Sequence, residues 1–262
     1  MCGRMTQITD PAEVARIFDA DARIAADDES SSPRYNVAPT QPLTVVLQRA
    51  DEGRVVEQHR WGLIPSFSKS AKEGAKRINA RAETVATSPS FRSSFVKRRC
   101  IVPSDGFYEW RRTGGPKQPF FLHPPADAVL AMAGLWAVWK DPETGLWVPS
   151  AAVITTDANR LVGTIHDRMP VLLPREAWDD WLDPAVDDRE YLLSLLEPAP
   201  DDVLDIYAIS TRVNNVRNDG PDLIRPAQET EAPLLPLPTF HGGAELVDVA
   251  DRETVFRVFD ET

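Results

Sequence analysis

Short apolar runs rich in β-branched and aromatic residues recur along most of this chain, and they restrict its fold more than any other feature. Turn-forming residues separate these runs, and the turn at 51–53 joins two of them in a hairpin. Helical periodicity is confined to stretches between the runs. The expected strands span residues 43–48, 54–64, 100–111, 119–123, 129–139, 146–156 and 203–210, and the expected helices span residues 10–20, 157–165, 174–182 and 189–196. This pattern predicts an α+β fold with a β-rich, barrel-like antiparallel core and peripheral helices.

Length and composition predict one domain with an appended tail. The 262 residues, 42% of them apolar, suffice for a single large core. We expect residues 2–228 to form this domain, because residues 229–262 become acidic and rich in Pro. The chain has no run of 18 apolar residues, no apolar signal core near its start and only two Cys. These features predict a cytoplasmic protein that does not enter a membrane, associated with the nucleoid if the source is prokaryotic.

The charge is unevenly distributed. The net charge of −11 argues against nucleic acid as a partner for the chain as a whole. Residues 69–99, however, contain nine basic residues and two acidic ones. Such a stretch can steer an anion such as DNA towards the protein, although a merely solvated basic surface would look the same.

The N-terminus carries unusual potential chemistry. A Met before a residue as small as Cys2 is usually removed, and Cys2 would then present a free α-amine beside its thiol. An aldehyde can form an imine with that amine and then accept the thiol, which closes a thiazolidine ring. From the N-terminus alone, however, an incidental leader residue is the better interpretation of Cys2.

The segment 77–84 places an amide and a guanidinium close together. Asn79 and Arg81 flank Ala80, so they point to the same face if this segment is extended. A phosphate with its sugar would suit this pair, and an exposed loop is an equally good explanation of the segment alone.

Two single titratable residues stand out in otherwise apolar surroundings. Glu109 lies among aromatic residues, where a cleft would raise its pKa and suit it to proton transfer, although a solvent-facing Glu is the more common case. His166 is followed by an acid and a base in a loop just before the apolar residues 171–173, and imidazole is the natural proton carrier at neutral pH, although a lone loop His is usually structural.

Taken together and in order, these motifs are specific. The chain closely resembles the SRAP (SOS response-associated peptidase-like) family from residue 2 to about residue 226. The resemblance rests on the segments MCGR, YNVAPTQ, WGLIPS, INARAET, SDGFYEW, QPFF, IHDRMPV and VNNVRNDGPDLI.

The resemblance implies the fold described above and a definite activity. Members of the family bind abasic sites in single-stranded DNA, including junctions with duplex, and form a covalent thiazolidine with the sugar aldehyde during the DNA damage response. By this resemblance Cys2 is the nucleophile, Asn79 positions the sugar and phosphate, Glu109 transfers protons, and His166 assists ring opening and reversal. The DNA-contacting positions would be Arg4, Arg81, Thr155 and Arg168 at phosphates, Pro39 and Trp110 as an apolar wedge, and Phe67 where the family often carries Trp.

The resemblance therefore predicts a DNA–protein crosslinking enzyme with lyase-type chemistry that acts as a monomer and needs no metal or other cofactor. Two alternatives stay open at this point. Cys2 could serve as the nucleophile of an N-terminal-nucleophile cysteine peptidase that also removes its own Met1. The chain could instead bind single strands without covalent chemistry.

Overall fold

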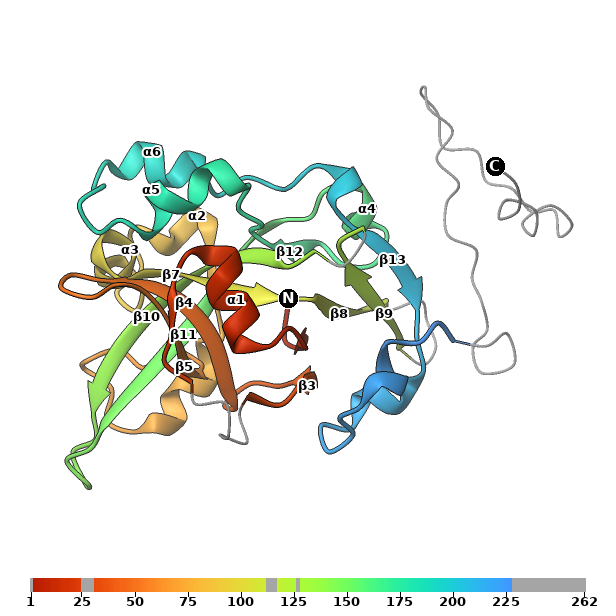
Figure 1. Cartoon of the computed structure of the whole chain (residues 1–262), viewed down its shortest axis with the longest axis horizontal. Helices are drawn as coiled ribbons and strands as arrows, with labels where there is room; N and C mark the ends of the chain where they lie inside the picture. The colour runs from red at the N-terminus through yellow and green to blue at the C-terminus, as the bar shows by residue number, and fades with distance from the viewer. Residues whose placement is uncertain (1, 25–30, 112–116, 126–127, 228–262) are drawn as a thin grey trace, which may run out of the picture.

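Five strands close into a barrel, which lies in the left half of Figure 1. The computed structural model describes residues 2–24, 31–111, 117–125 and 128–227, so the tail predicted from residue 229 lies outside the described residues. Antiparallel pairs join the barrel strands in series, and a short parallel pair between the first and the last closes the ring. In order around the barrel the strands are β5 (Gly53–Trp61), β4 (Pro42–Arg49), β7 (Arg99–Ser104), β10 (Leu130–Lys140) and β11 (Trp147–Asp157).

Three short strands extend this sheet. β12 (Arg168–Pro170) pairs with β11 in antiparallel orientation, while β2 (Asp21–Ala22) runs parallel to β5 and β6 (Asn79–Arg81) runs parallel to β11. The predicted barrel-like core is therefore confirmed, with parallel pairs added to a mainly antiparallel sheet.

Alternation along the strands separates two cores. On β4, Leu43, Val45 and Leu47 face the barrel interior, whereas Val46 faces the helices outside. Cys2 belongs to the interior cluster, so the N-terminus of the described chain packs into the barrel core.

A second, entirely antiparallel sheet lies beside the barrel, at the right in Figure 1. Its strands, in spatial order, are β13 (Asp205–Ala208), β9 (Gln118–His123), β8 (Gly106–Arg111), β1 (Met5–Gln7) and β3 (Arg34–Val37).

The stretch 100–111, expected to be one strand, is divided between the two sheets: β7 ends at Ser104 and β8 begins at Gly106. The side chain of Asp105 explains the bend, because its carboxylate accepts hydrogen bonds from the backbone N–H groups of Ile8 at 2.5 Å and Thr9 at 3.2 Å and from the Thr9 hydroxyl. Gly106 is needed because a Cβ there would lie 2.4 Å from the Phe121 ring.

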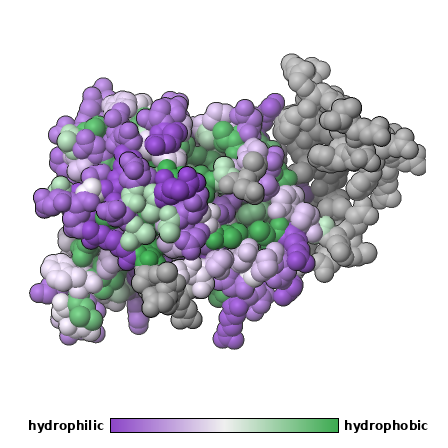
Figure 2. Space-filling view, viewed as in Figure 1, coloured by the Kyte–Doolittle hydropathy of each residue, from purple (hydrophilic) through white to green (hydrophobic). Residues whose placement is uncertain are grey.

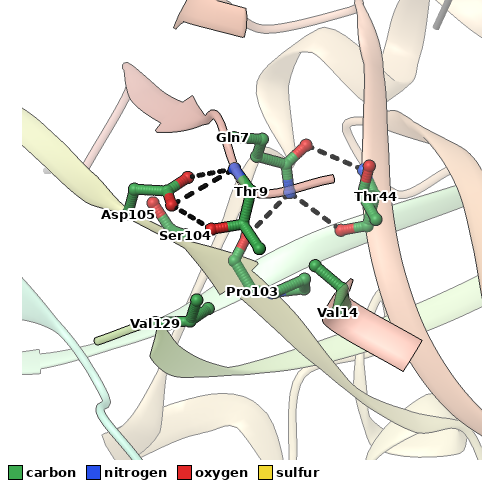
Figure 3. A pocket seen from close by; sticks show the side chains of 8 residues that line it. All are labelled: Gln7, Thr9, Val14, Thr44, Pro103, Ser104, Asp105 and Val129. Carbon is green, nitrogen blue, oxygen red and sulfur yellow. Dashed lines mark hydrogen bonds between the residues drawn. The ribbon is translucent and has the colours of Figure 1, made fainter. Parts of the chain in front are cut away.

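The side chain of Gln7 joins the two sheets (Figure 3). Its amide nitrogen donates to the carbonyl oxygens of Thr44 and Pro103 at 3.0 and 2.8 Å, and its oxygen accepts from Thr44 N–H at 2.9 Å. The small cavity drawn in Figure 3 is lined by these same groups, so it belongs to the structural junction.

The helices are short, and most of the α-helices cover the outside of the barrel (Figure 1). Asp10 caps the first helix by accepting from Ala12 N–H at 2.8 Å, and Phe18 at its end stacks on Trp178 with ring centroids 4.3 Å apart. Each of the four predicted helices is present, although the one expected over 157–165 is reduced to a single turn. The α-helices are α1 (Pro11–Phe18), α2 (Ala82–Val85), α3 (Arg92–Lys97), α4 (Arg160–Gly163), α5 (Trp178–Leu182) and α6 (Arg189–Ser194). The 3-10 helices are η2 (Ala71–Lys76), η3 (Arg175–Ala177), η4 (Asp201–Val203), η5 (Thr211–Asn214) and η6 (Pro221–Ile224).

Most of the face seen in Figure 2 is hydrophilic, and its apolar side chains gather in a band to the right of the centre. Within the described part of the chain, no helix is long and apolar enough to span a membrane.

Candidate active site

Cys2 lies three residues before β1 and packs in the barrel core cluster, which also contains residues of the second sheet. β1 pairs with β8 through Met5 and Phe107, and Tyr108 N–H donates to the Arg4 carbonyl oxygen at 3.0 Å, which brings the N-terminal residues beside Glu109. The Cys2 side chain is completely buried. Burial raises the pKa of the Cys2 thiol, and the nearby Glu109 carboxylate raises that pKa further. The thiol is therefore protonated at neutral pH in this state.

Asn79 contacts Cys2 directly. Its Nδ2 donates to the Cys2 carbonyl oxygen at 2.7 Å, although 77 residues separate the two in the chain. The contact exists because β6 runs parallel to β11, with Asn79 beside Val153, and Val153 lines the same core cluster as Cys2. The structure therefore brings the Asn79 amide against Cys2, and the role predicted for Asn79 at the sugar and phosphate stays a prediction.

Glu109 is buried, with 2% of its surface exposed, so the solvent-facing interpretation of this residue was wrong. Burial raises the pKa of the Glu109 carboxyl, and the charge of His166 acts in the opposite direction. The Glu109 carboxylate thus acts electrostatically on the Cys2 thiol, and His166 acts on Glu109. A carboxyl whose pKa is raised by burial is suited to proton transfer near neutral pH.

His166 follows α4 and precedes β12, with 28% of its side chain exposed. Arg168 N–H donates to His166 Nδ1 at 3.0 Å, which places the proton of the neutral ring on Nε2. The exposed Asp167 carboxylate lies 2.9 Å from the same Nδ1 and can accept its proton when the ring is charged. The Nδ1 atom therefore has the Arg168 N–H as a partner in the neutral ring and the Asp167 carboxylate as a partner in the charged ring.

Three buried polar atoms lie on the strands around this site. Asn79 Oδ1, Thr155 Oγ1 and Arg168 Nε have no hydrogen-bond partner among the described residues. They come from adjoining strands, because Thr155 lies beside Arg81 of β6 and beside Pro170 of β12. A buried polar group without a partner costs about 1–3 kcal/mol, so these atoms are natural contacts for a polar ligand.

The residues predicted to contact DNA lie in different environments. Arg81 is exposed, Thr155 is completely buried, and Pro39 is half-buried just after β3. Phe67 is 59% exposed on the loop after β5, where the carbonyl of Ser68 accepts from Trp139 Nε1 at 2.8 Å.

The Arg4 guanidinium has structural partners. Nη1 donates to Asn36 Oδ1 at 2.6 Å and to the Val213 carbonyl oxygen at 2.8 Å, and the guanidinium lies 5.8 Å from the centre of the Trp110 ring. Trp110 Nε1 in turn donates to Asn214 Oδ1 at 2.7 Å. Arg4 therefore attaches the segment after β13 to the second sheet and supports the ring of Trp110.

Arg168 is also engaged. Its guanidinium forms a bidentate pair with Glu83, at 2.6 and 3.0 Å, and contacts Asp157 at 2.6 Å. Sequence reasoning missed both carboxylates. Glu83 lies within the INARAET segment but was counted only as a charge, and nothing in the sequence pairs it with a residue 85 positions away.

A cysteine in contact with an amide and under the electrostatic influence of a buried carboxyl, which a histidine influences in turn, defines a candidate covalent catalytic site. Among the described residues, no three His, Cys, Asp or Glu side chains gather as metal ligands would.

The chain belongs to the SOS response associated peptidase (SRAP) family, whose model matches residues 1–216. The abasic site processing protein YoqW of Bacillus subtilis is 40% identical over 225 residues, which cover 86% of this chain and 99% of YoqW. The abasic site processing protein HMCES of Gallus gallus is 34% identical, over 75% of this chain and 67% of HMCES. Among solved structures, a protein of Bacteroides thetaiotaomicron superposes with a TM-score of 0.78 and 28% identity, over 87% of this chain and all of that one.

Proposed function

We propose that this protein recognises abasic sites in single-stranded DNA and traps them covalently through Cys2. The observation that carries the proposal is the hydrogen bond from Asn79 to the carbonyl oxygen of the buried Cys2. The buried Glu109 carboxylate acts electrostatically on the Cys2 thiol, and His166 acts on Glu109. The names of the relatives support abasic-site processing in general, and the crosslink is the finer step that we add.

The reaction balances without an external reagent. His166 exchanges the ring-oxygen proton as the closed sugar opens to its aldehyde. The Cys2 amine, free once Met1 is removed, adds to the aldehyde carbon, and Glu109 protonates the resulting hydroxyl so that one water leaves and an imine forms. The Cys2 sulfur then bonds to the imine carbon while its proton passes to the nitrogen, which closes the thiazolidine.

The thiol environment favours this reaction over peptide hydrolysis. A cysteine peptidase needs a thiolate, and both burial and Glu109 raise the pKa of the Cys2 thiol. Imine chemistry begins instead at the amine and uses the thiol only after an electrophilic imine has formed. The complete burial of Cys2 also implies that the reaction requires access to be opened at the N-terminus. Met1 lies outside the described residues.

The test is incubation of the purified protein with a single-stranded oligonucleotide that contains one abasic site. We expect a denaturation-resistant adduct whose intact mass is the sum of the two components less one water, formed only by protein without Met1. Cys2→Ala should form none. Cys100→Ala is the matched control, because Cys100 is equally buried but lies on β7 within the barrel. A full yield of adduct from Cys2→Ala would refute the proposal. The preference for junctions, the monomeric state and the cytoplasmic location stay predictions.

A further inference from the structure

The Arg168 side chain joins two parts of the site that are distant in sequence. It is only 11% exposed, and its Nη1 and Nη2 donate together to the two carboxylate oxygens of Glu83. Nη2 also donates to the Thr155 carbonyl oxygen at 2.7 Å. A bidentate pair fixes the plane of the guanidinium as well as its distance, which a single contact cannot do.

Glu83 is held on a rigid support. It lies in the first turn of α2, which begins directly after β6, the strand that carries Asn79. Ala82 and Val85 on either side of it are buried in the outer core cluster. The position of the Glu83 carboxylate is therefore tied to that of Asn79.

Arg168 also contacts His166. Arg168 pairs with Asp157 across β11 and β12, and Ala158 N–H donates to the Asp167 carbonyl oxygen at 3.0 Å, which closes the loop between them. The backbone N–H of Arg168 then donates to His166 Nδ1. Arg168 therefore links Glu83, which its side chain contacts, to the His166 ring, which its backbone N–H contacts.

We propose that Glu83 is a positioning residue that, through Arg168, aligns His166 with the strand carrying Asn79. The inference rests on the proposed function, because it concerns the step that His166 performs there. Glu83 itself is not expected to transfer protons. The hydrogen bond from Arg168 lowers the pKa of its carboxyl, and both of its oxygens are occupied by the guanidinium.

The test compares crosslinking rates on the single-abasic oligonucleotide for wild type, Glu83→Gln, His166→Ala and the double variant. We expect Glu83→Gln to slow crosslinking by roughly 10-fold to 100-fold, as displaced catalytic groups do. In the His166→Ala background, Glu83→Gln should not lower the crosslinking rate further, because the imidazole that Glu83 aligns is absent. A purely structural role would not produce this non-additivity.

Two further variants serve as controls. Glu13→Gln removes a similar bidentate pair, with Arg16 at 2.8 and 2.5 Å on α1, and should crosslink at the wild-type rate. Glu83→Asp keeps the charge on a shorter side chain and should show a smaller, equally non-additive loss. Thermal unfolding should be nearly unchanged in both Glu83 variants, because Glu83 is half-exposed and Arg168 keeps Asp157 and the Thr155 carbonyl oxygen as partners.

The outcomes separate this inference from the proposed function. If wild type forms no adduct, the proposed function fails and the inference fails with it. If wild type reacts and Glu83→Gln reacts equally fast, only the inference is refuted. Additive losses in the double variant would also refute it. Faster reaction of Glu83→Gln would refute it too, because Glu83 would then be competing with DNA phosphate for Arg168.

Discussion

Replacing Arg99 should show that some basic residues in the stretch 69–99 stabilise the fold and do not bind DNA. Arg99 begins β7, is only 2% exposed and uses all five of its N–H donors on backbone carbonyl oxygens. Its acceptors are the carbonyl oxygens of Trp181 (2.7 Å), Phe95 (2.9 Å), Val96 (2.6 Å), Asp183 (2.5 Å) and Val186 (2.9 Å). Burial lowers the pKa of Arg99 to about 10, so the side chain is still charged at neutral pH.

The cost of Arg99→Lys follows from counting donors. Lysine has three N–H groups, so at least two of the five carbonyl oxygens lose their partner. A hydrogen bond to a charged group contributes about 1.5–3 kcal/mol, which predicts a loss of about 3–6 kcal/mol in the free energy of unfolding. A domain of this kind is stable by about 5–15 kcal/mol, so the loss would be a large fraction of the total.

Urea denaturation followed by tryptophan fluorescence measures this loss. Arg98→Lys is the matched control, because the neighbouring guanidinium is half-buried and donates to the side chain of Ser93 at 2.7 Å. We expect that control to change the free energy of unfolding by less than about 1 kcal/mol. Folded Arg99→Lys should still crosslink abasic DNA at the wild-type rate. Wild-type stability in Arg99→Lys, or lost DNA binding by the folded variant, would refute the reasoning.

Three further predictions concern the site. Because burial raises the pKa of Glu109, wild type loses stability as pH rises from the ordinary Glu range of about 4.3 through the raised folded value. Glu109→Gln lacks this loss, so its free energy of unfolding relative to that of wild type should increase as pH rises above the ordinary Glu pKa of about 4.3, while crosslinking slows. Equal pH profiles of the two proteins would contradict the assignment. Arg81→Gln should reduce the slope of log affinity against log salt for single-stranded DNA by about 0.7, and an unchanged slope would exclude a phosphate contact. The buried Cys2 thiol should react with a thiol reagent far more slowly in folded protein than in urea, as followed by mass spectrometry, and equal rates would show that the site is already open.

Much of the architecture was predictable because it depends on local patterns. The β4–β5 hairpin follows from alternating residues around the turn at 51–53, and its register pairs Arg49 with Gly53 as a tight turn requires. The division of 100–111 was not predictable in this way. A continuous apolar run looks the same whether it stays in one sheet or crosses to another, and the bend depends on the N–H groups of Ile8 and Thr9, almost a hundred residues away.

The site shows the same limit. The order of the motifs was enough to identify Cys2, Asn79, Glu109 and His166 as candidates. The sequence could not show that Glu109 is buried, nor that Asn79 contacts the Cys2 carbonyl, because both depend on how β6 and β8 pack against other strands.

The sequence by itself determined which residues this protein has for its chemistry and which segments form strands, since side-chain type and alternation are local properties. Only the tertiary structure decided what each charge does. Arg99 is saturated by carbonyl groups, Arg4 holds a segment 209 residues away, and Arg168 is paired with Glu83, whereas Arg81 is exposed. The physical reason is that the hydrogen-bond partners of a charged side chain and its exposure to solvent decide whether it can bind a ligand. Folding brings those partners from distant parts of the chain.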